Sequence, residues 1–427
     1  MDANSSDISR FKMQSNKFSG NISKGLSKTK QRLIKEMIYG MQAAKDVKLS
    51  NISRALKENI PLIKTEDRLS RNLDDEDFTT HINNQLLRLA DDKIDDSMVI
   101  AIDPGDVEKP YAKKMEYLCD VYDGSEHRNA RGYHLCQVTA ANLEHNKIVP
   151  LYCEAYSSQE EGYINATEKI KDIISYVKQK IGTQGTWAID RQGDNQHIIA
   201  HFLKEELNFV TRLKLNRYLH FNHNNVKQAQ ADHIDRFIKQ WHQTTIVTIE
   251  DGRVKQHTLE YGCLEVALPD LPDQWFTLCA VKGFGIHPML LITNKKINLQ
   301  SSKDLWRIVE IYLTRWKCDE CYRYIKQSYN LEDFRVRSYN SIRNIVVLTH
   351  AIAYFSSVYL GMSLKLKIMV AKMFVLAKRF FGIPTFYNYA MADGIFELLK
   401  KSATGIVNYI GKTGKNLDDF QLNLFPE

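Results

Sequence analysis

Two aspartates in this sequence follow short apolar runs that are typical of buried strands. Asp103 comes directly after Val99–Ile102, and Asp190 comes directly after Thr186–Ile189. A carboxylate at the end of a buried strand costs several kcal/mol unless a cation compensates it. Two such carboxylates in one sheet repel each other, and a divalent metal relieves that repulsion best. Oxygen ligands of this kind suit Mg²⁺ or Mn²⁺, which also bind phosphate oxygens. The alternative for each aspartate is a simple cap of a strand or turn.

Residues 301–329 show the pattern of one long helix that carries a third acid. Polar and aromatic residues recur at helical spacing along one side of this helix and form a stripe. The other sides are mostly apolar, so we expect this stripe to be buried and to face a ligand. Glu320 points roughly 100° away from that stripe, which favours Asp319 as the third acid and keeps Glu320 as the alternative. An ordinary i,i+4 surface pair is the alternative for Arg315 and Asp319. At about 100° per residue, the stripe holds Tyr312, Arg315, Asp319, Tyr322 and Lys326.

The run from Tyr312 to Lys326 resembles the Y-x2-R-x3-E-x6-K signature of transposases of the fourth insertion-sequence family. Its gaps of two, three and six residues match the signature. The segments 187–194, 209–214 and 290–295 are similar to other blocks of that family, and the likeness spans about residues 97–340. One departure is clear, because the glutamate of the signature is replaced here by Asp319, with Glu320 next to it.

The resemblance implies an RNase H-like core that nicks DNA at the ends of an element and transfers the strands to target DNA. Its catalytic acids would be Asp103, Asp190 and Asp319 or Glu320, and the first three would bind two Mg²⁺ or Mn²⁺ ions. The DNA-binding residues that the resemblance and the strand pattern suggest are Tyr312, Arg315, Lys326, Arg212 and Lys214. For Arg212 and Lys214, a solvated strand end is an equal alternative. The implied partners are double-stranded DNA, as terminal inverted repeats and target, and a second copy of the chain in a homodimer.

The order of patterns between residues 97 and 215 is strand, strand, strand, helix, strand, helix, strand, which predicts a mixed α/β sheet. The fold class we expect is α/β, with an RNase H-like mixed-sheet core, a β-rich insertion, and helical regions on both sides. Five regions follow: a flexible basic and polar tail at 1–27, a helical DNA-binding domain at 28–96, the catalytic core at 97–215 and 301–340, the insertion at 216–300, and a C-terminal helical region at 341–427, a candidate for dimerisation.

The net charge of +7 is concentrated at the start of the chain, where residues 1–70 hold 14 Lys and Arg against 7 Asp and Glu. This surplus suggests a polyanion-binding appendage, with a solvated helical tail as the alternative. Candidate phosphate contacts are Lys28, Lys30, Arg32, Lys35 and Arg54. Seven scattered cysteines, an uneven number, favour reduced thiols. The absence of an apolar leader or span predicts a cytoplasmic, nucleoid-associated protein of bacterial type that does not enter membranes.

Three functions therefore compete. The leading one is a metal-dependent DNA transposase. A second is an RNase H-like nuclease that cuts without strand transfer. The third is a DNA-binding protein descended from a transposase whose active site is impaired, which the aspartate at position 319 keeps open. In the family an aromatic residue of the insertion can receive a flipped base. Trp275 is a candidate for that role, with core packing as its alternative.

Overall fold

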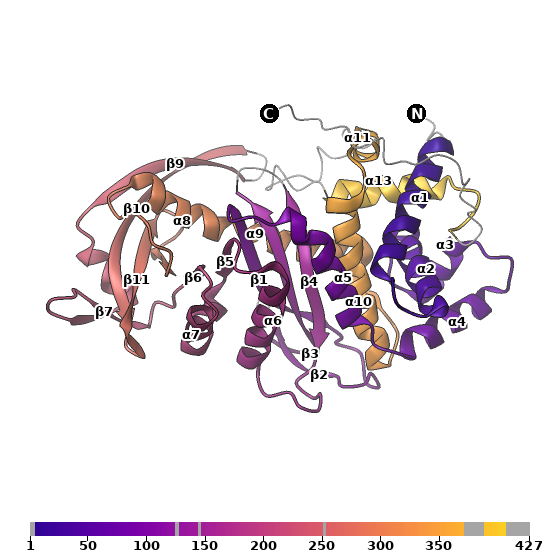
Figure 1. The fold of residues 1–427 in the computed structure, drawn as a ribbon, viewed down its shortest axis with the longest axis horizontal. Helices are drawn as coiled ribbons and strands as arrows, with labels where there is room; N and C mark the ends of the chain where they lie inside the picture. The colour runs from indigo at the N-terminus through magenta and orange to yellow at the C-terminus, as the bar shows by residue number, and fades with distance from the viewer. Residues whose placement is uncertain (1–4, 124–127, 144–146, 251–252, 371–387, 407–427) are drawn as a thin grey trace.

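The computed structural model describes residues 5–123, 128–143, 147–250, 253–370 and 388–406. Three regions follow one another along the longest axis in Figure 1: a group of helices, a sheet with helices on its faces, and a set of long strands. The first and the last helices of the chain lie together at one end. The chain is thus a mixed α/β protein, as the order of sequence patterns predicted.

Five helices open the chain, followed by the short 3₁₀ turn η1 (Asp91–Lys93). They are α1 (Ser5–Ile22), α2 (Lys28–Ala44), α3 (Leu49–Leu56), α4 (Leu62–Asp74) and α5 (Thr79–Ala90). The prediction of a flexible tail is wrong for residues 5–22, which form α1. Phe11 and Phe18 of α1 are fully buried and pack on Phe355, which lies far along the chain. That contact stabilises a helix whose own sequence is too polar to indicate one.

The C-terminal helices pack on the N-terminal ones and form one helical unit with them. They are α10 (Tyr339–Tyr354), the π-helical turn η5 (Phe355–Tyr359), α11 (Met362–Val370) and α13 (Asn388–Lys400). Asn344 Nδ2 donates to the backbone oxygen of Leu73 at 2.9 Å, and Lys12 Nζ donates to that of Thr404 at 2.6 Å. The described parts of the helical regions predicted at 28–96 and 341–427 therefore pack together as one body. Residues 371–387 and 407–427 of the candidate dimerisation region lie outside the described residues.

Among the described residues, no single helix is long and apolar enough to cross a membrane. Tyr339–Tyr359 together with Met362–Ile368, bent by 105°, passes that test on length and composition alone.

All strands of the described residues belong to one twelve-stranded sheet. Its first six are β1 (Met98–Glu108), β2 (Cys119–Asp123), β3 (Arg128–Asn142), β4 (Ile148–Tyr156), β5 (Thr186–Ile189) and β6 (Phe209–Arg212). Strand β3 pairs antiparallel with both β1 and β4. Strand β5 pairs parallel with β1 and with β6. The last parallel pair between β1 and β5 joins Ile102 to Ile189, so Asp103, which stays within β1, and Asp190, which follows β5, come directly after neighbouring residues.

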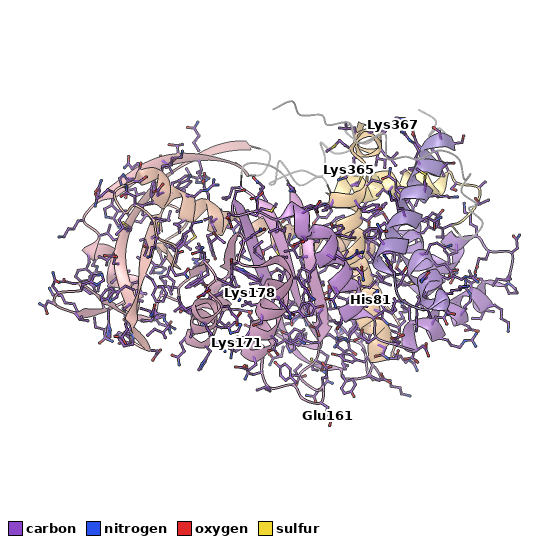
Figure 2. All side chains as sticks on the ribbon, in the orientation of Figure 1. His81, Glu161, Lys171, Lys178, Lys365 and Lys367 are labelled. Atoms are coloured by element: carbon purple, nitrogen blue, oxygen red, sulfur yellow. The ribbon has the colours of Figure 1, made fainter. Side chains whose placement is uncertain are left out.

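Helices cover both faces of this sheet. Ile100 and Ile102 of β1 belong to the apolar cluster that includes α6 (Ala166–Ile181) and α7 (Gln196–Lys204), whereas Val99 belongs to the cluster that includes α8 (Ser302–Thr314). The outer side of α6 carries Lys171 and Lys178, both labelled in Figure 2. Because side chains alternate along a strand, Asp103 lies on the same face as Val99, toward α8.

The region 216–300 is β-rich, but it continues the core sheet. After the 3₁₀ turn η2 (Arg191–Gly193) and helix α7 come the remaining strands and the 3₁₀ turn η3 (Ala231–Phe237). Strand β12 pairs with β6 on one side and β11 on the other, so the insertion extends one edge of the sheet. The strands are β7 (Tyr218–Phe221), β8 (Lys227–Gln230), β9 (Trp241–Glu250), β10 (Arg253–Leu268), β11 (Leu271–Lys282) and β12 (Met289–Thr293).

The single long helix expected over 301–329 is broken at Arg315 into α8 and α9 (Trp316–Tyr329). The backbone tightens there, because Arg315 N donates to Tyr312 O at 3.1 Å and Cys318 N donates to Arg315 O at 2.8 Å. Helix α8 packs on the cluster of β5, β6 and β12, and α9 packs on β1 and β3. The bend lets each helix follow its own part of the twisted sheet. A short 3₁₀ turn, η4 (Leu331–Asp333), follows α9.

Candidate active site

Two carboxylates meet at the point where β1 and β5 stop pairing. Asp103 is in β1 and Asp190 follows β5, each one residue beyond the last parallel pair, Ile102 with Ile189. Neighbouring strands lie about 4.8 Å apart, so the two side chains are close neighbours. Asp190 Oδ1 also accepts a hydrogen bond from Gln192 N at 2.8 Å, which caps η2. Asp190 therefore caps η2, as predicted, and also lies next to a second carboxylate.

The third carboxylate comes from α9. Arg315 Nη1 lies 2.6 Å from Asp319 Oδ1 and 3.6 Å from Asp103 Oδ1. The arginine side chain is only 8% exposed, so this is a buried bridge rather than the surface pair that i,i+4 spacing alone would allow. The break in the helix at Arg315 is what directs the guanidinium between the two acids. Asp103 and Asp319 are thereby joined through Arg315, and Asp190 lies near enough for its charge to act on both.

The charges at this place are poorly balanced. Burial raises the pKa of Asp103 to about 8, and the negative charges of Asp319 and Asp190 add to that rise while Arg315 opposes it. Burial also raises the pKa of Asp319, again with Asp190 adding and Arg315 opposing. When all three carboxylates are ionised, the single guanidinium of Arg315 does not balance their charge. A cation is the ligand that such a site fits.

The carboxylate oxygens of Asp103, Asp190 and Asp319 are ligands of the kind that a divalent metal binds. Three carboxylates are hard oxygen ligands, and Mg²⁺ and Mn²⁺ prefer such ligands. The deficit of positive charge fits the same ions. In the described part of the chain, however, no three His, Cys, Asp or Glu side chains are close enough together to hold one ion. The residues therefore fit the ion in chemistry and charge, while Arg315 is the group that joins two of them in this structure.

Glu320 lies on another side of α9. Its carboxylate is 2.7 Å from Arg323 Nη1, and its side chain is 10% exposed. Burial raises the pKa of Glu320, and the nearby charge of Asp319 adds to this, whereas Arg323 opposes it. Glu320 is not among the charges that act most strongly on Asp103. Of the two acids that the sequence offered for the third position, Asp319 is the one beside Asp103.

Tyr312 and Arg212 border the acids on the side of α8. Tyr312 is buried, its hydroxyl is hydrogen-bonded to the side chain of Arg212, and the Arg315 guanidinium lies 5.6 Å from its ring centre. Lys214 is farther along, exposed, and its backbone N donates to Asp194 Oδ2 at 2.7 Å. Arg212 is thus connected to the site through Tyr312, whereas the hydrogen bond of Lys214 to Asp194 comes from its backbone N.

Lys326 lies along β1, beyond the acids. Its Nζ donates to the backbone oxygen of Asp106 at 3.0 Å and is 2.7 Å from Glu332 Oε1. The Tyr322 ring lies below it, 4.9 Å from Nζ to the ring centre. Gly105 makes this packing possible, because a Cβ at that position would come 3.1 Å from Tyr322 Cε1. Strand β1 continues through Pro104 and Gly105 to Glu108.

A second row of polar side chains on the same strands was not apparent from the sequence. His134 Nδ1 is 3.0 Å from Asp106 Oδ1, and the thiol of Cys119 is hydrogen-bonded to His134. The hydrogen bond with Asp106 is the main cause that raises the pKa of His134 to about 9. His134 is therefore cationic at neutral pH. The cross-strand register of Asp106 with His134 is the only signal that would have predicted this pair, and it requires knowing the strand pairing.

Several other sequence candidates lie away from the acids. Trp275 is half-buried and stacks on His223 at 3.6 Å between ring centroids. Of the basic residues at the start of the chain, Lys30 is paired with Asp75 at 2.9 Å, and Arg32 is paired with Glu36 at 2.6 Å. These two ion pairs lie within the helical unit.

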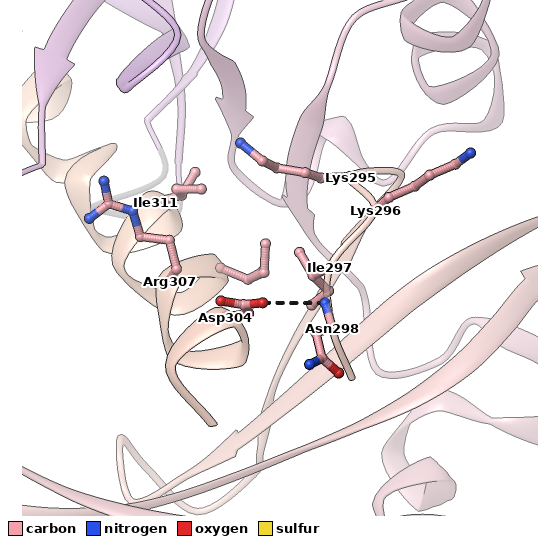
Figure 3. A pocket seen from close by; sticks show the side chains of 8 residues that line it. Lys295, Lys296, Ile297, Asn298, Asp304, Arg307 and Ile311 are labelled. Carbon is pink, nitrogen blue, oxygen red and sulfur yellow. Dashed lines mark hydrogen bonds between the residues drawn. The ribbon is translucent and has the colours of Figure 1, made fainter. Parts of the chain in front are cut away.

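A separate cavity of about 550 Å³ lies at the opposite end of β5 from Asp190. Figure 3 shows Lys295 and Lys296 at its mouth and Asp304 accepting a hydrogen bond from the backbone of Asn298. Lys295 Nζ reaches Thr186, the first residue of β5, at 3.2 Å. This cavity is thus not part of the carboxylate site.

The chain matches no protein-family model and no curated protein. Among solved structures it is similar to a chain in the cryo-EM structure of the piggyBac transposase synaptic complex with hairpin DNA. The TM-score is 0.39 at 11% sequence identity, and the match covers 93% of this chain and 77% of that chain. A likeness of this size does not establish a shared fold or activity.

Proposed function

We propose that the chain is a DNA transposase of the DDE type, which cleaves DNA at the ends of an insertion element and joins those ends to target DNA. The observation that carries the proposal is the pairing of Asp103 and Asp319 with the buried Arg315, beside Asp190, whose charge acts on both acids. Each acid comes from a different element: the middle of β1, the end of β5 and the first turn of α9.

The strand order supports an RNase H-like core. The central strands run β4-β3-β1-β5-β6, with β1 and β3 antiparallel, β3 and β4 antiparallel, and β1, β5 and β6 parallel. Helix α6 connects β4 to β5, and α7 connects β5 to β6. In this arrangement the acids lie at the carboxyl end of the parallel pair, where open α/β sheets generally bind ligands. The helix that follows the insertion supplies the third acid.

The residues around the acids suit a phosphodiester. Arg315 Nε is buried and has no hydrogen-bond partner among the described residues, so a donor remains free beside the carboxylates. A phosphate oxygen of DNA is a suitable acceptor, since guanidinium donors bind phosphate strongly. Tyr312 holds Arg212 next to this donor. Arg212 and Arg315 would then orient the scissile phosphate, and Lys326 would contact the backbone farther along β1.

Asp103, Asp190 and Asp319 would hold two Mg²⁺ or Mn²⁺ ions. Bound there, such ions activate the attacking water or 3′-hydroxyl and stabilise the leaving oxygen. Because the pKa of Asp103 is raised to about 8, this carboxyl must release a proton before it can bind a cation. Arg315 must also give up part of its hold on Asp319, and its guanidinium then becomes available to the phosphate. The arginine thus keeps the acids together until metal and DNA arrive.

A second candidate function is a DNA-binding protein derived from a transposase and unable to cleave. It is favoured by one observation: the acids are joined through Arg315, and no three of them gather on one point in the described residues. Asp319 is also one methylene shorter than the glutamate that the signature carries. The RNase H-like nuclease without strand transfer uses the same geometry and differs only in the second reaction. For all three functions we propose double-stranded DNA as the partner, a homodimer on DNA, and a cytoplasmic location.

The test uses purified protein and duplex DNA taken from both sides of the reading frame. Mg²⁺-dependent nicking near the ends, followed by joining of the ends to a supercoiled plasmid, is expected for a transposase. Nicking without joining identifies the nuclease. Binding without nicking, in both Mg²⁺ and Mn²⁺, identifies the impaired protein. The Asp103→Asn variant is the matched control, because it removes one charge and keeps the shape of the side chain.

A further inference from the structure

A groove begins where β1 and α9 end. It is a cavity of about 710 Å³ between residues 108–115, which follow β1, and residues 332–337, which follow α9. The same two elements carry Asp103 and Asp319, so each wall of the groove continues an element of the candidate active site. We call this cavity the flank groove.

The flank groove is held in shape by one buried lysine. Lys109 is 6% exposed, and its Nζ donates to the backbone oxygens of Glu332 and Phe334, the latter at 2.7 Å. The same nitrogen lies 3.5 Å from the centre of the Phe334 ring. Burial lowers the pKa of Lys109 to about 8. These contacts tie the loop after β1 to the segment after α9, so the groove exists before any ligand binds.

The rim of the flank groove is basic. Its exposed cations are Lys113, Lys114, Arg335 and Arg337. Within the described part of the chain none of these four has an acidic side chain at ion-pair distance. The acids along the groove are already engaged: Glu332 with Lys326 at 2.7 Å, Asp333 with Lys48 at 2.5 Å, and Glu108 with Arg128 at 2.7 Å.

One further acid, Glu116, accepts a hydrogen bond from the backbone N of Tyr339 at 2.7 Å. Four cations therefore face one carboxylate that has no cation partner in the described residues. Tyr111 stands at the mouth of the groove, 93% exposed, with its hydroxyl available to an acceptor. An exposed tyrosine beside unpaired lysines and arginines is the composition of surfaces that bind nucleic-acid backbones.

The spacing agrees with a duplex that passes over the acids. From Asp103 to Lys109 the chain advances six residues along β1, or about 20 Å at the rise of a strand. This distance corresponds to about six base pairs of B-DNA. Lys326 Nζ donates to the backbone oxygen of Asp106, which lies between Asp103 and Lys109 along the chain. The duplex would thus meet Lys326 first and the flank groove next.

We propose that the flank groove binds the backbone of duplex DNA about six base pairs from the cleaved phosphodiester, through Lys113, Lys114, Arg335 and Arg337. The proposal rests on the proposed function, because that function places the scissile bond at Asp103. Phosphate contacts of this kind set the register of the DNA and carry no sequence preference. The flank groove is therefore a positioning surface, separate from the groups that react.

The first test measures the salt dependence of DNA affinity. A variant with serine at the four rim cations is compared with the parent chain on a duplex of about 25 base pairs, long enough to span acids and groove. The plot of log affinity against log salt is expected to lose about 3–4 units of slope, since each released phosphate contact contributes about 0.9. The matched control replaces Lys180, Lys204, Lys239 and Lys303, four exposed lysines outside the groove, and should keep most of the slope. Equal losses in both variants would overturn the proposal.

The second test separates this proposal from the proposed function. Duplexes with three or with twelve base pairs beyond the nick site are bound to the parent chain and to the rim variant. The longer flank should bind more tightly to the parent chain only. Asp103→Asn should show the same gain with the longer flank, although it does not cleave. If the parent chain cleaves DNA but binds the longer flank no more tightly than the shorter one, the proposal for the flank groove is refuted and the proposed reaction is not. A gain without any cleavage would refute the proposed reaction and leave the groove intact.

Discussion

Asp103 of β1 and Asp319 of α9 share one cation: Arg315 Nη1 lies 3.6 Å from the first carboxylate and 2.6 Å from the second. The arrangement places two like charges, from distant parts of the chain, within reach of a single guanidinium. Because Asp190 is the third charge acting on this pair, one arginine does not balance the group. The residual negative charge is the physical basis of the proposed metal site, and it makes the site testable without a DNA substrate.

Removing one carboxylate should abolish cleavage and spare binding. We expect Asp103→Asn and Asp190→Asn to reduce nicking by a factor of about 100 or more, as the loss of several kcal/mol of transition-state stabilisation predicts. Affinity for the same duplex should stay within about three-fold, because both residues are anionic and do not attract phosphate. Nicking rates and fluorescence anisotropy on the same preparations measure the two quantities. Normal nicking by either variant would contradict the site.

The same Asp103→Asn change should stabilise the fold. The pKa of Asp103 is about 8 in the folded chain and about 3.9 in an unfolded one, so stability falls as pH rises between those values. The variant escapes this loss and should gain up to about 5 kcal/mol at pH 8, with little gain near pH 4. Urea unfolding at both pH values measures the difference. Mg²⁺ should stabilise the parent chain more than the variant, since only the parent keeps all three acids.

Asp319 and Glu320 should behave differently. Asp319→Ala removes the carboxylate that Arg315 holds beside Asp103, and we expect nicking to fall about as far as in Asp103→Asn. Glu320→Ala breaks the pair with the exposed Arg323 and should leave nicking within a few-fold of the parent rate. Single-turnover nicking in Mg²⁺ compares the two variants directly. A loss confined to Glu320→Ala would show that the other acid is the ligand.

Arg315→Met should destabilise the chain in a pH-dependent way. Removing the buried partner of two carboxylates costs about 3–5 kcal/mol when both are charged. The acids whose pKa values are already raised will take up protons as pH falls, so the loss should be largest at pH 8 and smaller at pH 5. Denaturant titrations at the two pH values test this expectation. A loss of equal size at both would indicate that Arg315 acts by packing alone.

A buried histidine outside the site should make the chain sensitive to acid. Burial lowers the pKa of His350 to about 3, whereas an unfolded histidine titrates near 6.5. The unfolded chain therefore binds a proton that the folded chain excludes, and stability is lost as pH falls below 6.5. Between pH 7 and 5 this accounts for about 2 kcal/mol. Between pH 7 and pH 5, the free energy of unfolding of His350→Leu should fall by about 2 kcal/mol less than that of the parent chain. At every pH, however, the variant lacks the contact between His350 and Gln137.

Local patterns of the sequence were enough to predict the α/β class and the two acids that directly follow buried apolar runs, although β1 continues beyond Asp103. Each of these depends on side chains that are neighbours in the chain. A strand buried on both faces is apolar throughout, and the residue that ends it is conspicuous when it is charged. The same local view favoured Asp319 over Glu320, because a helix repeats every 3.6 residues even when it is later bent.

Tertiary structure alone decided the rest. Helix α1 forms because Phe11 and Phe18 pack on Phe355, and the bend at Arg315 arises because α8 and α9 cover different parts of a twisted sheet. The flank groove requires the ends of β1 and α9 to lie side by side, which no spacing in the sequence expresses. The spacing of apolar residues indicates that one side of a segment packs against an apolar surface, but it does not identify that surface. Which surface that is, and which charges it brings near, depends on contacts between residues hundreds of positions apart.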